Sequence, residues 1–162
     1  MKRLTLLVLF SILMAPFSSA PLAEGLKVGT LFDTSGALKD WGPRQQKAAE
    51  LAAQQMAAAG FTIEFFHEDS QTAAEPAKKA ARKLIETDKV AVIIGSSSSG
   101  VIVPVAESVT CPENVLMISP GATSPFITDL PEDKEKDFLF RTCPSDAAGW
   151  RPVCTKPPRS CT

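Results

Sequence analysis

The sequence predicts an α/β protein built on a doubly wound parallel sheet. Five short apolar runs alternate with segments whose apolar residues recur at helical spacing. Continuous apolar runs bounded by helical segments are typical of strands in parallel sheets. Two of the runs, 90–94 and 115–119, lead directly into loops rich in hydroxyl groups and glycine. Strands and helices that alternate at this spacing favour a parallel sheet with right-handed connections.

The first predicted unit is a strand at 26–32 (LKVGTLF), followed by a turn-rich loop and a helix from about 41 to 59. Pro43 in the first turn and Gly60 after the last turn are typical of a helix start and a helix end. Helical spacing of the apolar residues predicts one stripe that packs against the sheet. The residues of this expected stripe are Ala48, Leu51, Ala52, Met56 and Ala59.

The second predicted unit begins with a strand at 61–68 (FTIEFFHE). The helix after it opens with Thr72 and Glu75, which have the spacing of a capping box, and it continues to about residue 85. Its basic side chains are interpreted as a solvated helix face, with a partner-binding face as the alternative. These side chains are Lys78, Lys79, Arg82 and Lys83.

The remaining elements are strands at 90–94, 115–119 and 138–142 (FLFRT), with a helix at about 101–110 after the first of them. Pro104 lies near the start of this helix. Proline removes a backbone donor, so a late start or a kink is expected.

The N-terminus is predicted to be a signal peptide covering residues 1–20. A basic start is followed by the mostly apolar segment 4–14. Eleven helical residues reach only about 16 Å, whereas a bilayer core is roughly 30 Å thick. A cleaved signal therefore fits better than a permanent anchor, and the mature protein is expected in the periplasm. A buried N-terminal helix is the alternative.

The last residues, 150–162 (WRPVCTKPPRSCT), have no periodicity and are predicted to be an irregular tail. Cys154 and Cys161 in this tail are able to pair with each other, although nothing requires it. Cys111 precedes a predicted strand and Cys143 follows one, so in a parallel sheet they lie at opposite ends, too far apart for a disulfide.

Composition and motifs exclude several function classes. A net charge of −1 leaves no electrostatic footprint for nucleic acid. The segment from Gly95 to Gly100 has the glycine spacing of a phosphate-binding loop but lacks the lysine that must follow. Ser98 loosely resembles a nucleophile elbow, but the single histidine, His67, lies upstream of it. Neither an enzyme, a cofactor nor a metal site is therefore predicted.

The two hydroxyl-rich loops predict a small binding site. Ligands of open α/β sheets lie at the carboxyl ends of the strands. A helix that starts near Ser99 directs free N–H groups at this edge, where they suit a carboxylate. The loop of Gly121, Ala122 and Thr123 offers carbonyls for an ammonium group and one hydroxyl. The alternative is that both loops only cap strands and helices.

Five segments in the same order resemble the N-terminal lobe of a type I periplasmic binding protein, of the kind that serves branched-chain amino acid ABC transporters. The resemblance covers residues 26–146. Its segments are KVGTLFDTSGALKDWG, FHEDSQTAAEPAKKAARKLI, VAVIIGSSSSGVIVPVAE, VLMISPGATSPFIT and FLFRTCPSD.

The resemblance implies ligand-binding roles for particular residues. Ser99 matches the serine that meets the ligand carboxylate, and Thr123 the threonine that contacts the amino-acid backbone of the ligand. Gly121 matches the residue whose carbonyl takes the ammonium group. Trp41 stands where the family often has a tyrosine that covers the ligand. The full set of candidate ligand-binding residues is Trp41, Ser98, Ser99, Gly121, Ala122 and Thr123.

The resemblance also implies a function and partners. A monomeric substrate-binding component of an importer for branched-chain or related small amino acids or amides is expected, with a membrane permease as partner. Family members continue into a second lobe where this chain has 150–162. Micromolar binding corresponds to about −8 kcal/mol, so half of it leaves roughly millimolar affinity. We therefore expect a truncated lobe that binds weakly or not at all alone; the alternative function is a stand-alone flavodoxin-like sensory or interaction module.

Overall fold

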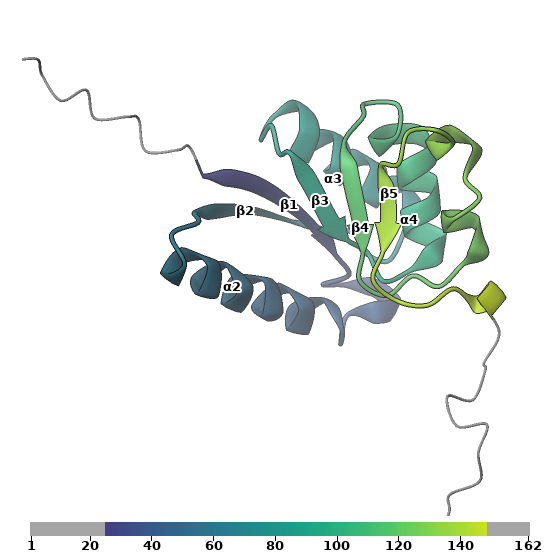
Figure 1. Ribbon diagram of the computed structural model, residues 1–162. Coiled ribbons are helices and arrows are strands. Elements are labelled where there is room, and N and C mark those ends of the chain that lie inside the picture. The colour runs from purple at the N-terminus through teal and green to yellow at the C-terminus, as the bar shows by residue number, and fades with distance from the viewer. Residues whose placement is uncertain (1–24, 149–162) are drawn as a thin grey trace, which may run out of the picture.

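The computed structural model describes residues 25–148 and contains five parallel strands flanked by helices (Figure 1). The strands are β1 (Leu26–Phe32), β2 (Ile63–Asp69), β3 (Val92–Gly95), β4 (Leu116–Ser119) and β5 (Leu139–Arg141). All neighbours pair in parallel, which confirms the predicted sheet. The expected signal peptide at 1–20 and the expected tail at 150–162, with Cys154 and Cys161, lie outside the described residues.

The strand order across the sheet is β2-β1-β3-β4-β5. The chain moves outward from β1 to β2, then crosses back to β3 and continues in the other direction. The carboxyl ends of β1 and β3 therefore lie side by side where the winding reverses. In doubly wound sheets this reversal opens the crevice in which ligands bind.

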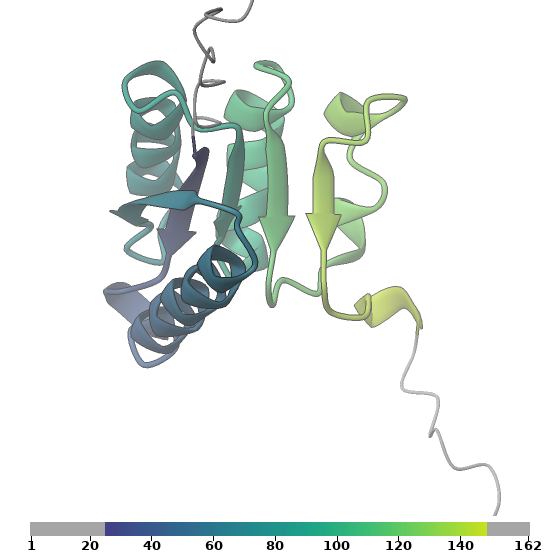
Figure 2. The same ribbon diagram turned by 60° about the vertical axis from the view of Figure 1, so that its left-hand side comes forward.

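The helices cover the two faces of the sheet unequally (Figures 1 and 2). Helix α3 (Ala74–Glu86) and helix α4 (Ser99–Val105) lie together on one face, whereas α2 (Gly42–Ala58) lies over β1 and β2 on the other. The hydrophobic core fills the space between the sheet and the α3–α4 layer. Its fully buried members include Leu31, Leu84, Ile93, Ile102 and Met117.

The face of the sheet that carries α2 is only partly covered. Side chains alternate between the two faces of a strand, and those of β3 and β4 that point away from the core are half-exposed: Val92, Ile94, Leu116 and Ile118. The two apolar runs are therefore fully buried on one face only. Figure 2 shows why, because α2 crosses the β1–β2 side and leaves the front of β3, β4 and β5 bare.

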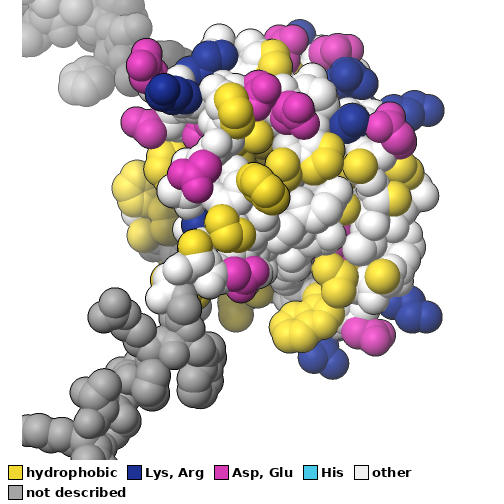
Figure 3. All heavy atoms as spheres, turned by 90° about the vertical axis from the view of Figure 1, so that its right-hand side faces the viewer, with side chains coloured by type: hydrophobic (Ala, Val, Ile, Leu, Met, Phe, Trp, Pro, Cys, Tyr) yellow, Lys and Arg dark blue, Asp and Glu magenta, His cyan; other side chains and the backbone are white. Residues whose placement is uncertain are grey.

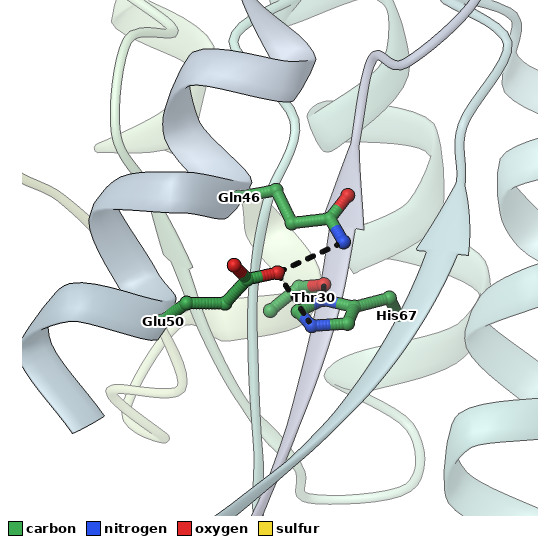
Figure 4. Close-up of polar contacts among 4 residues, drawn as sticks. All are labelled: Thr30, Gln46, Glu50 and His67. Atoms are coloured by element: carbon green, nitrogen blue, oxygen red, sulfur yellow. Dashed lines mark hydrogen bonds and ion pairs between the residues drawn. The ribbon is translucent and has the colours of Figure 1, made fainter. Parts of the chain in front are cut away.

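The apolar stripe predicted for α2 is wrong. Leu51 is 55% exposed and Met56 is 41% exposed, and Gly42 is the only buried residue of the helix. The helix instead contacts the sheet through polar side chains (Figure 4). His67 of β2 bonds the Thr30 hydroxyl through Nδ1 at 2.6 Å, and its Nε2 lies 3.8 Å from the Glu50 carboxylate of α2.

The capping box predicted at Thr72 and Glu75 is also wrong. The residue that precedes the helix is Ala73, and no side chain caps this end. The Thr72 hydroxyl accepts the N–H of Leu38 at 3.1 Å and donates to the carbonyl of Ser35 at 3.0 Å. This hydroxyl is occupied by a tertiary contact, which local spacing cannot anticipate.

Pro104 changes the type of helix rather than delaying its start. Helix α4 already begins at Ser99, so a late start is wrong, while the expected irregularity appears as a π-helical segment at Ala106–Thr110. The Ser108 hydroxyl donates to the carbonyl of Pro104 at 2.6 Å. The irregular segment begins two residues after the proline, and the Ser108 hydroxyl supplies a donor to the Pro104 carbonyl there.

Cys111 and Cys143 are free thiols at opposite ends of their strands, as expected. Cys111 precedes β4 and is fully buried. Burial, together with the nearby Asp133 carboxylate, raises the pKa of its thiol to about 11. Its charged form is therefore strongly disfavoured, and its role in the described part of the chain is packing.

The surface visible from the β5 side shows acidic and basic side chains interspersed with hydrophobic ones (Figure 3). Mixed charge on this face agrees with the net charge of −1. Within residues 25–148, no helix has the length and apolar character needed to span a bilayer.

Candidate functional site

The loop after β3 presents serine side chains and free N–H groups at the carboxyl edge of the sheet. Ser96 is buried, whereas Ser97, Ser98 and Ser99 are half-buried. The N–H of Ser98 donates to the Ser96 hydroxyl at 3.0 Å. The first N–H groups of a helix have no acceptor within the helix. In the described residues, those of Ser99 and Gly100 make no hydrogen bond and point out of the start of α4.

A buried hydrogen bond joins the loop after β4 to this serine loop. Ser119 is fully buried, and its hydroxyl donates to the carbonyl of Ser96 at 2.7 Å. The same oxygen accepts the N–H of Ala122 at 3.0 Å and lies 3.4 Å from the N–H of Gly121. One buried hydroxyl therefore sets the spacing between the two loops.

The two loops also meet at their exposed edges. The N–H of Ser124 donates to the hydroxyl oxygen of Ser99 at 3.2 Å. Because this oxygen acts as an acceptor, the hydroxyl hydrogen of Ser99 is available to a ligand. Ser99 and Thr123 thus lie on the same edge of the sheet, one residue removed from direct contact.

Gly121 carries the one carbonyl of residues 120–124 that has no hydrogen-bond partner in the described residues. The carbonyls of Pro120 and Ala122 accept from Thr142 and Cys143. Those of Thr123 and Ser124 accept from the guanidinium of Arg141, at 3.4 Å and 2.6 Å. The loop therefore offers a single free carbonyl.

Thr123 brings a carboxylate into the site. Its hydroxyl donates to Asp146 at 2.8 Å, and the N–H of Asp146 donates back to the Thr123 carbonyl at 2.9 Å. The Thr123 oxygen keeps lone pairs that accept a further donor. Thr123 and Asp146 together present acceptor oxygens and one negative charge, next to the free carbonyl of Gly121.

Trp41 stands at the start of α2 and is 59% exposed. The helix that carries it is linked to the serine loop by Gln45, whose side-chain Nε2 donates to the Ser97 hydroxyl at 2.6 Å. Gly42, the next residue, packs directly against the backbone of Asp33, where a Cβ would lie 2.2 Å from the Asp33 carbonyl oxygen. Trp41 is therefore held beside the site by its neighbours.

Asp69 fixes the loop that leads from β1 towards Trp41. Its carboxylate accepts the N–H of Thr34 at 3.0 Å and both the N–H and the hydroxyl of Ser35, at 3.1 and 2.5 Å. Partial burial acts to raise the pKa of Asp69, but the hydrogen bonds from Ser35, Gln71 and Thr34 outweigh it and lower the pKa below its usual value.

The structure brings five of the six predicted residues together at one edge. Ser98 and Ser99 start α4, and Gly121, Ala122 and Thr123 lie across from them. Ala122 offers no free group, because it is buried and its N–H and carbonyl are both bonded. Trp41 lies on the neighbouring helix start.

Sequence reasoning missed several residues that shape this site. They are Asp33, Gln45, Arg141 and Asp146. Asp33 directly follows a strand, which is a usable signal because side chains after strand ends gather at the ligand edge. Gln45 gives no signal, since a polar residue in an amphipathic helix is ordinarily solvated.

His67 takes no part in this edge. Its ring bonds Thr30 across the β1–β2 pair at one side of the sheet, whereas Ser98 lies beyond the end of β3. The nucleophile–base contact that a serine hydrolase requires is therefore not made between the two.

The sequence profile of the family described as "Periplasmic binding protein" matches residues 25–155. This match spans most of the chain. The chain belongs to the periplasmic binding protein family.

Solved structures of periplasmic binding proteins resemble this chain. The branched-chain amino acid transporter substrate-binding protein LivJ of Streptococcus pneumoniae, in complex with isoleucine, is 28% identical with a TM-score of 0.67 and is matched over 76% of this chain and 35% of its own. A solute-binding protein of an ABC transporter from R. palustris, in complex with benzoate, is 28% identical with a TM-score of 0.66, over 77% of this chain and 34% of its own.

The leucine-binding protein LivK of Thermotoga maritima shares the fold at 21% identity and a TM-score of 0.64, over 75% of this chain and 33% of its own. The periplasmic binding protein described here thus spans about a third of the length of the structures it matches and corresponds to part of one lobe. No curated protein matches the chain significantly.

Proposed function

We propose that the chain is the ligand-binding lobe of a substrate-binding component of an ABC importer for branched-chain or related small amino acids or amides. The observation that carries this proposal is the meeting of the two loops at Ser99 and Ser124. Donors lie on one side of this contact and acceptors on the other. That separation matches a zwitterion, in which carboxylate and ammonium are joined through one carbon.

The carboxylate half of the site is formed by the start of α4. The free N–H groups of Ser99 and Gly100 and the Ser99 hydroxyl are donors at the start of this helix, and no arginine is among them. Backbone N–H groups at the start of a helix stabilise an anion through hydrogen bonds and through the helix dipole.

The ammonium half is formed by the second loop. The free carbonyl of Gly121, the Thr123 hydroxyl and the Asp146 carboxylate are acceptors. An ammonium group has three donors, so these three oxygens are sufficient partners. Asp146 also supplies the opposite charge.

Location and partner follow from the same proposal. Periplasmic binding proteins deliver solutes to membrane permeases, so we propose a periplasmic location after removal of residues 1–20, a permease as the protein partner, and a monomer. The lobe at 26–146 is proposed to be the part of the chain that binds ligand.

A lone lobe offers one wall of a binding cleft, and its affinity is expected to be low. Binding that is shared with a second wall loses about half of its free energy, which moves a micromolar dissociation constant towards millimolar. Hinge closure around the ligand also requires two lobes.

The test is titration of the ¹⁵N-labelled chain with isoleucine, leucine, valine and benzoate, followed by NMR. Saturable shifts at the amides of Ser99, Gly100 and Thr123, with dissociation constants weaker than about 100 μM, are expected for the amino acids. Benzoate has no ammonium group and is expected to bind more weakly. Amino acids that leave these three amides unmoved would refute the proposal. Tight binding by the lone lobe would contradict the expected share of the missing wall.

A further inference from the structure

Asp33 is a fully buried carboxylate at the point where the winding of the sheet reverses. It follows β1 directly. Its Oδ1 accepts the hydroxyl groups of Ser70, after β2, and of Ser96, after β3, the latter at 2.7 Å. Its Oδ2 accepts the backbone N–H of Ser97 at 2.9 Å. One side chain therefore ties the carboxyl ends of three neighbouring strands.

Asp33 holds the serine loop at more than one position of its backbone. Ser96 donates its hydroxyl to Asp33 and, with the same oxygen, accepts the N–H of Ser98. The carboxylate thus holds the backbone of Ser97 directly and that of Ser98 through one serine. These are the residues that set where the free N–H groups of Ser99 and Gly100 point.

The same chain of bonds continues to the second loop. The carbonyl of Ser96 accepts the Ser119 hydroxyl, and this hydroxyl holds the N–H groups of Gly121 and Ala122. Asp33, Ser96 and Ser119 are each fully buried. Hydrogen bonds in such a low-dielectric interior are strong. Removing one partner leaves the other buried and unpaired, which costs free energy.

We propose that Asp33 is a positioning residue for the ligand site, which fixes the serine loop directly and the Gly121–Thr123 loop through Ser96 and Ser119. It rests on the proposed function, because it assigns the geometry of that same site to a residue that does not touch the ligand. The chain offers an internal comparison, because two serines donate to the same oxygen of Asp33. Ser70 does so from the loop after β2, and Ser96 from the loop after β3.

The test compares Asp33→Asn with Ser70→Ala in the full chain. The amide group that replaces the carboxylate has only one acceptor oxygen. Either the N–H of Ser97 or the hydroxyl groups of Ser70 and Ser96 therefore lose their acceptor. We expect the amide signals of Ser97 and Ser98, and also those of Gly121 and Ala122, to move in Asp33→Asn. Affinity for isoleucine is expected to fall about tenfold.

Ser70→Ala removes a hydrogen bond from the same carboxylate but leaves the serine loop bonded. It is expected to lower the unfolding midpoint to a similar degree, with the Gly121 and Ala122 signals in place and isoleucine affinity within about twofold of wild type. Equal signal changes and equal affinity losses in the two variants would show that Asp33 is only structural, and would overturn the proposal.

Two further results separate the possible failures. If the wild-type chain binds no amino acid of the panel, the proposed function fails, and the Gly121 and Ala122 signals of Asp33→Asn alone decide the positioning role. If Asp33→Asn does not fold, Ser96→Ala replaces it, because this variant keeps the carboxylate and removes the hydroxyl through which Asp33 holds Ser96, the residue whose carbonyl accepts the Ser119 hydroxyl. Unmoved Gly121 and Ala122 signals in Ser96→Ala would refute the proposal.

Discussion

The backbone N–H of Ser124 lies 3.2 Å from the hydroxyl oxygen of Ser99, which joins the loop after β4 to the loop after β3. This contact uses the Ser99 oxygen as an acceptor and leaves its hydrogen free. It places a donor group and the acceptor groups of Thr123 and Asp146 on one edge of the sheet, which is the arrangement behind the proposal of a small zwitterionic ligand.

Ser99→Ala removes the hydroxyl proposed to donate to the ligand carboxylate. Loss of one hydrogen bond to a charged group is expected to weaken isoleucine binding by about 1–2 kcal/mol, a factor of roughly 5–30. NMR titration measures the change. The matched control is Ser108→Ala, which removes an exposed hydroxyl beyond α4 that bonds only the Pro104 carbonyl. Equal binding by both variants would remove Ser99 from the site.

Asp146→Asn removes the negative charge proposed to face the ligand ammonium group. Leucine binding is expected to weaken by about 1–2 kcal/mol, through loss of a charge-assisted bond. Binding of 4-methylpentanoate, which is leucine without its amine, is expected to stay the same or to strengthen. Titration of both compounds against both proteins measures the difference, and parallel losses would indicate a general distortion of the loop instead.

Leu84 and Leu51 differ in burial, so replacing each with alanine is expected to change the free energy of unfolding by very different amounts. Leu84 of α3 is fully buried in the core, whereas Leu51 of α2 is 55% exposed. Leu84→Ala is expected to lower the free energy of unfolding by about 2–5 kcal/mol, through lost contacts and a cavity. Leu51→Ala is expected to change it by about 0.5 kcal/mol or less. Urea unfolding measures both, and a large loss from Leu51→Ala would mean that α2 packs differently.

Much of the fold followed from sequence because its cause is local. The apolar runs and the helical spacing between them predicted five strands and the helices of the α3–α4 layer, where the core residues Leu84 and Ile93 are indeed buried. The stripe on α2 failed for a non-local reason. Helical spacing shows that residues share a face, but not that anything lies opposite that face. Here Leu51 and Met56 of the predicted stripe are exposed, while Glu50 on another face lies 3.8 Å from His67 of the sheet.

The candidate site was predictable in outline and unpredictable in detail. Hydroxyl groups after two apolar runs marked both loops, since side chains after parallel strands gather at one edge. The partners of these groups come from distant segments. Asp33 and Ser97 are 64 residues apart, and Thr123 and Asp146 are 23 apart. Only the three-dimensional fold reveals which hydroxyls are already bonded and which remain free.

Asp69 is expected to make stability depend on acidic pH. Its folded-state pKa lies below the ordinary value of 3.8, so its ionised form stabilises the fold. The contribution is complete well above pH 3.8 and is lost as the pH falls below this value towards the folded-state pKa. Unfolding midpoints of wild type and Asp69→Asn should therefore differ at pH 7 and converge towards pH 3. Glu64→Gln, an exposed change on the same strand, is the control. A difference that is constant across this range would contradict the assignment.

A residue larger than glycine at position 121 is expected to destabilise the chain while Ser97 is present. A Cβ on Gly121 would lie 2.8 Å from the Ser97 hydroxyl oxygen and 3.0 Å from its Cβ. Gly121→Ala must push Ser97 away, which breaks its hydrogen bond with Gln45. Overpacking of this kind is expected to cost about 1–3 kcal/mol of unfolding free energy and to weaken ligand binding.

A second substitution tests whether the clash itself is the cause. Ser97→Gly removes both atoms that meet the new Cβ, so Gly121→Ala is expected to cost much less in a Ser97→Gly background than in wild type. In a double-mutant cycle, the double variant is expected to be more stable than the sum of the two single effects predicts, by about 1 kcal/mol or more. Gly100→Ala is the control, because its Cβ would lie 3.7 Å from the nearest side-chain atom, within ordinary contact distance. Additive effects of the Gly121 and Ser97 changes would show that the two loops are not in the contact described, and the separation of donor and acceptor groups at the site would lose its structural basis.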